Sequence, residues 1–86
     1  MKLKYKETTE AIIGSAFEVY NELGYGFLEK VYQRSLQVEL RQRGHSAELE
    51  PTIKVKFKEV IVGDYAADLL VDGKVIVELK VAKKTS

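Results

Sequence analysis

Residues 65–81 read YAADLLVDGKVIVELKV, and this stretch decides the fold. It contains two apolar, β-prone runs on either side of Asp72-Gly73, a pair of residues typical of hairpin turns. Asp68, Glu78 and Lys80 interrupt the two runs. A charged side chain inside an apolar strand is costly unless it is paired or bound to an ion. The stretch therefore predicts two antiparallel strands that carry a polar site.

The loop between these strands decides whether the two carboxylates can act together. A tight two-residue turn would place Asp68 and Glu78 on opposite faces of the hairpin, because side chains alternate along a strand. A three-residue loop at residues 71–73, with its glycine in the left-handed conformation, would pair Leu70 with Lys74 and place both carboxylates on one face. A joint role for the carboxylates therefore predicts the three-residue loop.

Two helices are expected before the strands. Residues 9–23 and 27–43 carry apolar side chains at steps of three and four, and a glycine follows each segment. Thr8 and Thr9 are candidate N-caps of the first helix. After the second helix, His45 is expected at the surface.

The period changes to two in residues 53–58, where apolar residues alternate with Lys54, Lys56 and Lys58. This pattern predicts a half-buried strand with a solvated lysine face. Residues 60–62 predict a further short strand. The last strand, residues 74–81, is apolar enough to be buried on both faces.

The order of elements predicts an α/β fold, with two N-terminal helices followed by a three- to four-stranded, mainly antiparallel sheet. The 86 residues suffice for one small domain, residues 1–86. We expect no membrane span and a cytoplasmic location, since the sequence shows neither a long apolar run nor a signal peptide.

Composition restricts the chemistry. The absence of cysteine excludes disulfides, thiol nucleophiles and cysteine-bound zinc, and a single histidine leaves little for a histidine-rich metal site. Any metal ion would be held by oxygen atoms, as Mg²⁺ prefers. The formal net charge of +1 gives only weak support for a nucleic-acid partner.

Three motifs together resemble a known family. An aspartate on one strand followed by Glu-x-Lys on the next is the PD-(D/E)XK signature, which Asp68, Glu78 and Lys80 match. Upstream, residues 26–32 read GFLEKVY and match a GxxExxY motif. Over roughly residues 8–82 the chain therefore resembles the GxxExxY family of the PD-(D/E)XK nuclease superfamily.

This resemblance implies a restriction-endonuclease-like core and Mg²⁺- or Mn²⁺-dependent cleavage of DNA or another nucleic acid. It implies that Asp68 and Glu78 bind the metal ion, that Glu29 is an auxiliary ligand and that Lys80 is the catalytic lysine. Structural alternatives remain open. The strand residues could form a buried ion pair, and Glu29 could serve only the helix dipole. The tyrosine of the motif, Tyr32, is expected in the core with its hydroxyl bonded.

Members of the family usually continue past the Glu-x-Lys strand into another helix and strand, whereas this sequence stops at Ser86. We therefore expect a core that lacks its last helix and strand, and a homodimer in which each exposed sheet face is covered by the partner. The functional alternatives to a nuclease are a catalytically inactive interaction module and a structural homo-oligomer subunit.

Overall fold

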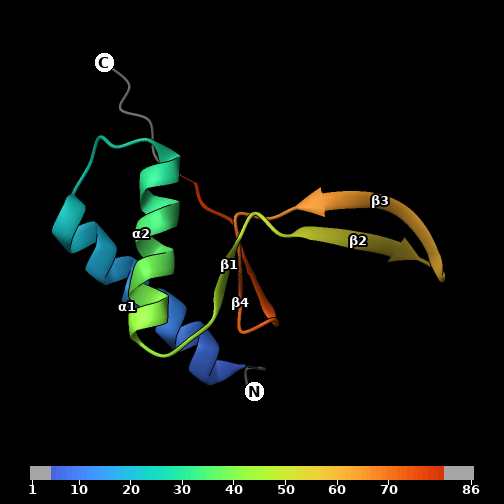
Figure 1. Ribbon diagram of the computed structural model, residues 1–86, viewed down its shortest axis with the longest axis horizontal. Helices are drawn as coiled ribbons and strands as arrows, with labels where there is room; N and C mark the ends of the chain where they lie inside the picture. Colours follow the sequence, from blue (N-terminus) through green and yellow to red (C-terminus); the bar gives the residue numbers. More distant parts are fainter. Residues whose placement is uncertain (1–4, 81–86) are drawn as a thin grey trace.

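The computed structural model describes residues 5–80 and has the predicted α/β fold (Figure 1). Two helices are followed by a three-stranded sheet of order β1-β4-β5 and a two-stranded ribbon of β2 and β3. The elements are α1 (Lys6–Leu23), α2 (Glu29–Gln42), β1 (Ala47–Leu49), β2 (Thr52–Phe57), β3 (Val60–Ala66), β4 (Leu69–Val71) and β5 (Val75–Val77).

One bent hairpin connects the ribbon with the sheet. β1 pairs with β4 and β2 with β3 in the same antiparallel register as far as Val55, after which a β-bulge shifts the pairing by one residue. Between the two ladders, the Glu50 amide donates to the Asp68 carbonyl (3.0 Å) and the Ala67 amide donates to the Pro51 carbonyl (3.3 Å). Glu50 has a φ of 48°, which bends the chain. β2 and β3 therefore project from the body as an arm, residues 52–66 (Figure 1).

The helices cover one face of the three-stranded sheet. The core side chains come from both helices and from β1 and β4, and they are Ala11, Leu36, Leu40, Ala47, Leu69 and Val71. On the other face, Leu70 is half-buried and lies opposite Ile76, which is 47% exposed. The expectation that the last strand is buried on both faces is therefore wrong, because helices cover only one face.

The loop between β4 and β5 contains three residues, Asp72, Gly73 and Lys74, since Val71 pairs with Val75. Gly73 is left-handed as expected (φ 65°), but Asp72 is left-handed too (φ 54°). The loop is therefore shifted by one residue, and the predicted pairing of residues 70 and 74 is wrong. Because the loop still contains three residues, side chains at even-numbered positions of the two strands, such as Leu70 and Ile76, lie on the same face, as the predicted loop requires.

The predicted strand at residues 53–58 corresponds to β2, and its lysines are exposed. The expectation that this strand is half-buried is wrong within the described residues, because Val55 and Phe57 on its apolar face are 43% and 63% exposed. The predicted strands at residues 60–62 and 65–71 are instead a single strand, β3, and then β4 after the bend. β1 carried no clear sequence pattern and was not predicted. It is only three residues long, too short to show a period.

The Asp72 carboxylate joins α1 to the sheet. Thr8 Oγ1 donates to Asp72 Oδ2 (2.8 Å), His45 Nδ1 lies 2.7 Å from the same oxygen, and the Ser46 amide donates to Oδ1 (3.0 Å). The prediction that Thr8 or Thr9 caps the first helix is wrong, because α1 begins at Lys6 and the Thr8 hydroxyl is used by this contact. His45 is likewise not a free surface residue, since its side chain is 16% exposed.

We expect a measurable acid sensitivity from this contact. The hydrogen bond from His45, followed by that from Thr8, lowers the pKa of Asp72 from 3.8 to about 2. A carboxyl with a lowered folded-state pKa stabilises the fold above its unfolded pKa and loses this contribution as the pH falls through its folded pKa. The free energy of unfolding of wild type should therefore approach that of Asp72→Asn as the pH falls from 5 to 2 in urea denaturation.

The matched control is Asp64→Asn, because the Asp64 carboxylate is 58% exposed and pairs only with Lys54 on the arm. Exposed pairs of this kind contribute little to stability. A constant difference between wild type and Asp72→Asn across this pH range would contradict the role of the ionised Asp72.

Ser15 gives a second stability prediction. It is fully buried on α1, and its hydroxyl has no hydrogen-bond partner within residues 5–80. An unsatisfied buried hydroxyl costs about 1–3 kcal/mol, and alanine is the better helix former. Ser15→Ala should raise the free energy of unfolding by about 1 kcal/mol, which is about 4–8 °C in Tm for a domain of this size.

The control for Ser15→Ala is Ser35→Ala on α2, because the Ser35 hydroxyl donates to the Val31 carbonyl (2.7 Å). Removing a satisfied hydroxyl should bring no comparable gain. A loss of stability in Ser15→Ala would show that the hydroxyl is bonded in solution.

Candidate functional site

The register of the last hairpin brings Asp68 and Glu78 together. Leu69 pairs with Val77 at the end of the ladder, and the same register continued by one residue sets Asp68 directly opposite Glu78. Directly opposite residues in an antiparallel pair point to the same face. Asp68 Oδ2 also accepts a hydrogen bond from the Leu79 amide, the residue after Glu78, at 2.6 Å. The two carboxylates therefore lie on the same side at the end of the hairpin.

The backbone of Asp68 is held from two directions. Its carbonyl accepts hydrogen bonds from Gln33 Nε2 of α2 (2.8 Å) and from the Glu50 amide (3.0 Å). Gln33 is buried, so its amide is ordered by the surrounding packing. Asp68 is thus fixed through its main chain by α2 and through its side chain by the residue that follows Glu78.

Tyr65 on β3 lies beside the carboxylates. The pKa of its phenol is raised, first by hydrogen bonding to the Glu78 side chain, then by desolvation, and then by the negative charges of Glu78 and Asp68. The phenol therefore stays protonated at neutral pH and is available as a hydrogen-bond donor. Glu78, which directly follows β5, therefore lies near β3.

Lys80 follows the carboxylates at an exposed position. It lies at the edge of a mainly apolar hollow of about 390 Å³, which Leu79, Tyr20, Tyr25 and Tyr32 also line. The hollow separates the end of the last hairpin from the turn between the two helices. Lys80 is therefore close to the carboxylates in sequence and is free to reach solvent.

Glu29 is the first residue of α2 and is exposed. Within residues 5–80, no three His, Cys, Asp or Glu side chains form a group that could hold a metal ion. Asp68 and Glu78 are therefore brought together as a pair, and a ligand role for Glu29 stays a prediction. The tyrosine of the same motif, Tyr32, donates its hydroxyl proton to the Gly24 carbonyl, as expected for a bonded core tyrosine.

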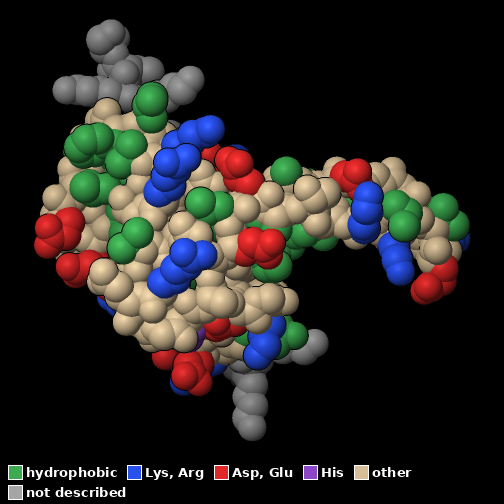
Figure 2. Space-filling model, in the orientation of Figure 1, with side chains coloured by type: hydrophobic (Ala, Val, Ile, Leu, Met, Phe, Trp, Pro, Cys, Tyr) green, Lys and Arg blue, Asp and Glu red, His purple; other side chains and the backbone are tan. Residues whose placement is uncertain are grey.

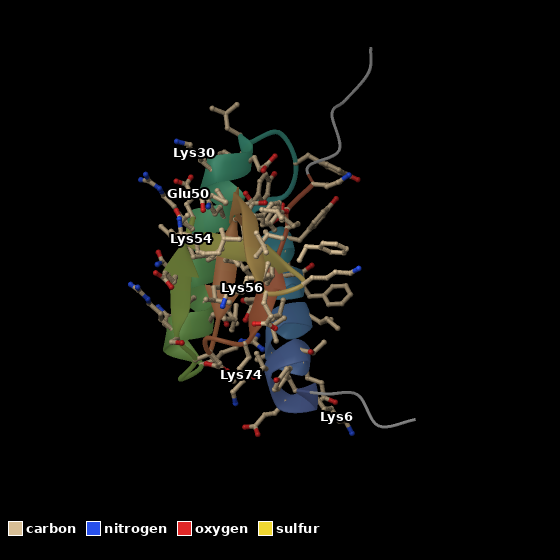
Figure 3. All side chains as sticks on the ribbon, turned by 90° about the vertical axis from the view of Figure 1, so that its right-hand side faces the viewer. Lys6, Lys30, Glu50, Lys54, Lys56 and Lys74 are labelled. Carbon is tan, nitrogen blue, oxygen red and sulfur yellow. The ribbon has the colours of Figure 1, made fainter. Side chains whose placement is uncertain are left out.

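The lysines of the arm lie apart from this pair. Lys54 and Lys56 extend from the arm, which points toward the viewer in Figure 3. Lys54 forms an exposed ion pair with Asp64 (2.7 Å). These lysines form a solvated face, as the alternating pattern predicted.

Two carboxylates suit a hard divalent cation. Mg²⁺ commonly takes one or two protein carboxylates and completes its octahedral shell with water and substrate phosphate. The pair Asp68 and Glu78 fits that requirement, and the chain offers no cysteine that would favour a softer metal. The residues present are therefore compatible with a magnesium- or manganese-type ion.

Sequence patterns did not single out Gln33, Tyr65 or the Leu79 amide. Gln33 follows Tyr32 on α2 and reads as an ordinary polar helix residue, and a backbone amide leaves no trace in a sequence. Tyr65 reads as a strand aromatic. These groups lie around the two carboxylates only in the folded chain, where the bend between β3 and β4 brings together residues that are far apart in the sequence.

None of the helices within residues 5–80 is both long and apolar enough to cross a membrane.

Comparison with known proteins assigns the family. No curated protein and no solved structure matches the chain significantly. The sequence profile of the PD-(D/E)XK nuclease superfamily, however, matches residues 6–86, nearly the whole chain. The chain therefore belongs to the PD-(D/E)XK nuclease superfamily.

Proposed function

We propose that the chain is a cytoplasmic, Mg²⁺- or Mn²⁺-dependent nuclease of the GxxExxY type that hydrolyses phosphodiester bonds in DNA or another nucleic acid. The observation that carries this proposal is that the register of the last hairpin, continued by one residue beyond Leu69 and Val77, sets Asp68 opposite Glu78 in a chain of this superfamily. Side-chain parity and the hydrogen bond from Leu79 to Asp68 both support the pairing.

In this proposal Asp68 and Glu78 hold the ion, and Glu29 is an auxiliary ligand. A bound ion of this kind polarises a phosphoryl oxygen and lowers the pKa of a water molecule. Lys80 orients the attacking water or stabilises negative charge on the phosphate in the transition state. Tyr65 lies beside the Glu78 carboxylate and offers its phenol as a hydrogen-bond donor.

A second candidate function is a catalytically inactive module that binds another macromolecule. The observation that favours it is the arm, whose apolar side chains are open to solvent over much of its length. Metal binding and cleavage separate the two functions, because an interaction module needs neither. A homodimer that covers the exposed sheet face would be compatible with either function.

Asp68→Asn and Glu78→Gln test the nuclease directly. Each change keeps the shape of the side chain but removes the charge that would bind the ion. We expect each variant to lose Mn²⁺ binding in calorimetry and to nick supercoiled plasmid at least about 100-fold more slowly than wild type.

The control is Asp64→Asn on the arm, which removes an exposed aspartate outside the site and should bind and nick like wild type. Wild type that binds Mn²⁺ without nicking would indicate that plasmid DNA is not the substrate. Wild type that binds no Mn²⁺ would favour the inactive module.

Gln33 offers a test of how the site is positioned. It contacts neither the proposed ion nor the substrate, but its amide fixes the Asp68 main chain. Residues that orient metal ligands typically change metal affinity by 10–100-fold when they are removed. Asp68 keeps its bond from the Glu50 amide when Gln33 is changed, so no buried carbonyl loses all its partners.

Gln33→Leu should therefore weaken Mn²⁺ binding by about tenfold while the protein remains folded. Gln37→Leu is the matched control, because Gln37 also lies on α2 and donates to a strand carbonyl, that of Ala47 (3.0 Å), away from the carboxylates. Both variants should lose similar stability, but only Gln33→Leu should lose metal affinity. Equal Mn²⁺ affinity in the two variants would show that Gln33 is merely structural.

A further inference from the structure

The arm has one apolar face that nothing in the described structure covers. Ile53, Val55, Phe57, Val60 and Tyr65 share this face according to the strand register. Ile53 is half-buried, whereas the other four side chains are between 43% and 63% exposed.

The position of the arm makes this exposure unusual. It extends away from the body, with lysine and hydrophobic side chains along its length (Figure 2). A two-stranded ribbon alone is marginally stable in water and normally needs a further layer on its apolar face. The apolar face of the arm is thus expected to pack against another surface.

A second unpartnered apolar surface lies on α1. Ile13, Phe17 and Tyr20 recur at steps of four and three, so they form an outer stripe. They are between 47% and 67% exposed, whereas the core side of the same helix is formed by Ala11, Ser15 and Val19. An amphipathic helix with one core face does not require a second apolar stripe.

The two elements carry formal charges of opposite sign. The arm, residues 52–66, carries three lysines against one glutamate and one aspartate, a formal charge of +1. α1 carries four glutamates against one lysine, a formal charge of −3. Lys54 and Lys56 lie on the face opposite the apolar one, so they would stay in solvent and would favour the approach of the two elements without touching α1 in the contact.

The exposed apolar area of the arm and of the α1 stripe is also large enough for a dimer interface. We take a fully exposed aromatic side chain as about 200 Å² and an aliphatic one as about 100 Å². On that basis one arm and one stripe together expose about 600 Å², and two reciprocal contacts bury about 1,200 Å². This area is at the lower end of the range for specific protein interfaces.

We propose that two copies of this chain exchange their arms, so that the apolar face of each arm packs on the outer stripe of α1 in the other copy. The contact is reciprocal and closed, as a two-fold dimer requires. Tyr65 lies both on this apolar face and beside Glu78, so the variants are made at Phe57 and Phe17, which are outside the carboxylate site.

Complementary charge variants test the exchange. Phe57→Asp on the arm and Phe17→Lys on α1 each bury a charge against an aromatic ring, so each protein alone should be monomeric in sedimentation velocity at about 100 µM. An equimolar mixture should recover the dimer, because one contact is intact and the other pairs aspartate with lysine. Val38→Asp on α2 is the control, since Val38 is equally exposed (54%) but outside both surfaces.

Cross-linking gives a second measurement that does not depend on charge. The chain has no cysteine, so Val60→Cys and Ile13→Cys each introduce a unique thiol. A short thiol cross-linker should join the two variants when they are mixed. Cross-linking confined to two Val60→Cys copies would show that arms pack on arms and would overturn the exchange.

Other outcomes of these measurements would overturn the arm exchange. A monomeric wild type, or dimers in both charge variants, would overturn the proposal. A mixture of the two charge variants that stays monomeric would overturn it as well. If Phe57→Asp keeps the mass of wild type but binds duplex DNA more weakly, the arm serves nucleic acid instead of a second copy. Nicking by a monomeric Phe57→Asp protein would separate the assembly from the proposed activity.

Discussion

The hydrogen bonds of Asp68 hold the separate parts of the fold together. Its carbonyl bonds to α2 and to the strand across the bend, and its carboxylate bonds to the end of the last hairpin. One residue therefore joins the helical layer, the bent hairpin and β5. Because Asp68 lies at the bend, the same geometry that exposes its carboxylate also directs the arm away from the body.

This arrangement explains how a small sheet can carry a charged pair. Carboxylates inside an apolar strand would be strongly destabilised, but Asp68 lies just beyond β4 and Glu78 just beyond β5. Both remain partly or largely accessible, and backbone and phenol donors surround them. Burial therefore destabilises the two carboxylates little, and that of Asp68 is held by a backbone hydrogen bond.

The sequence predictions failed where tertiary contacts overrode local preference. The Thr8 hydroxyl bonds to Asp72 instead of capping α1, and His45 is drawn in by the same carboxylate. The turn at the tip of the arm uses Lys58 and Glu59, both left-handed, where asparagine and glycine would be expected. No local pattern marks such a turn, because the strand pairing imposes it.

Local sequence patterns alone predict the two helices, the α/β class, the lysine face of the arm, and the candidates Asp68, Glu78 and Lys80. These features are visible because helical and strand periods, glycine stops and charges in apolar runs are local properties. Only the tertiary structure decided which loop separates β4 from β5, which groups hold Asp68, and that the arm leaves the body. Those outcomes depend on register and on contacts between residues far apart in the chain, which no local pattern encodes.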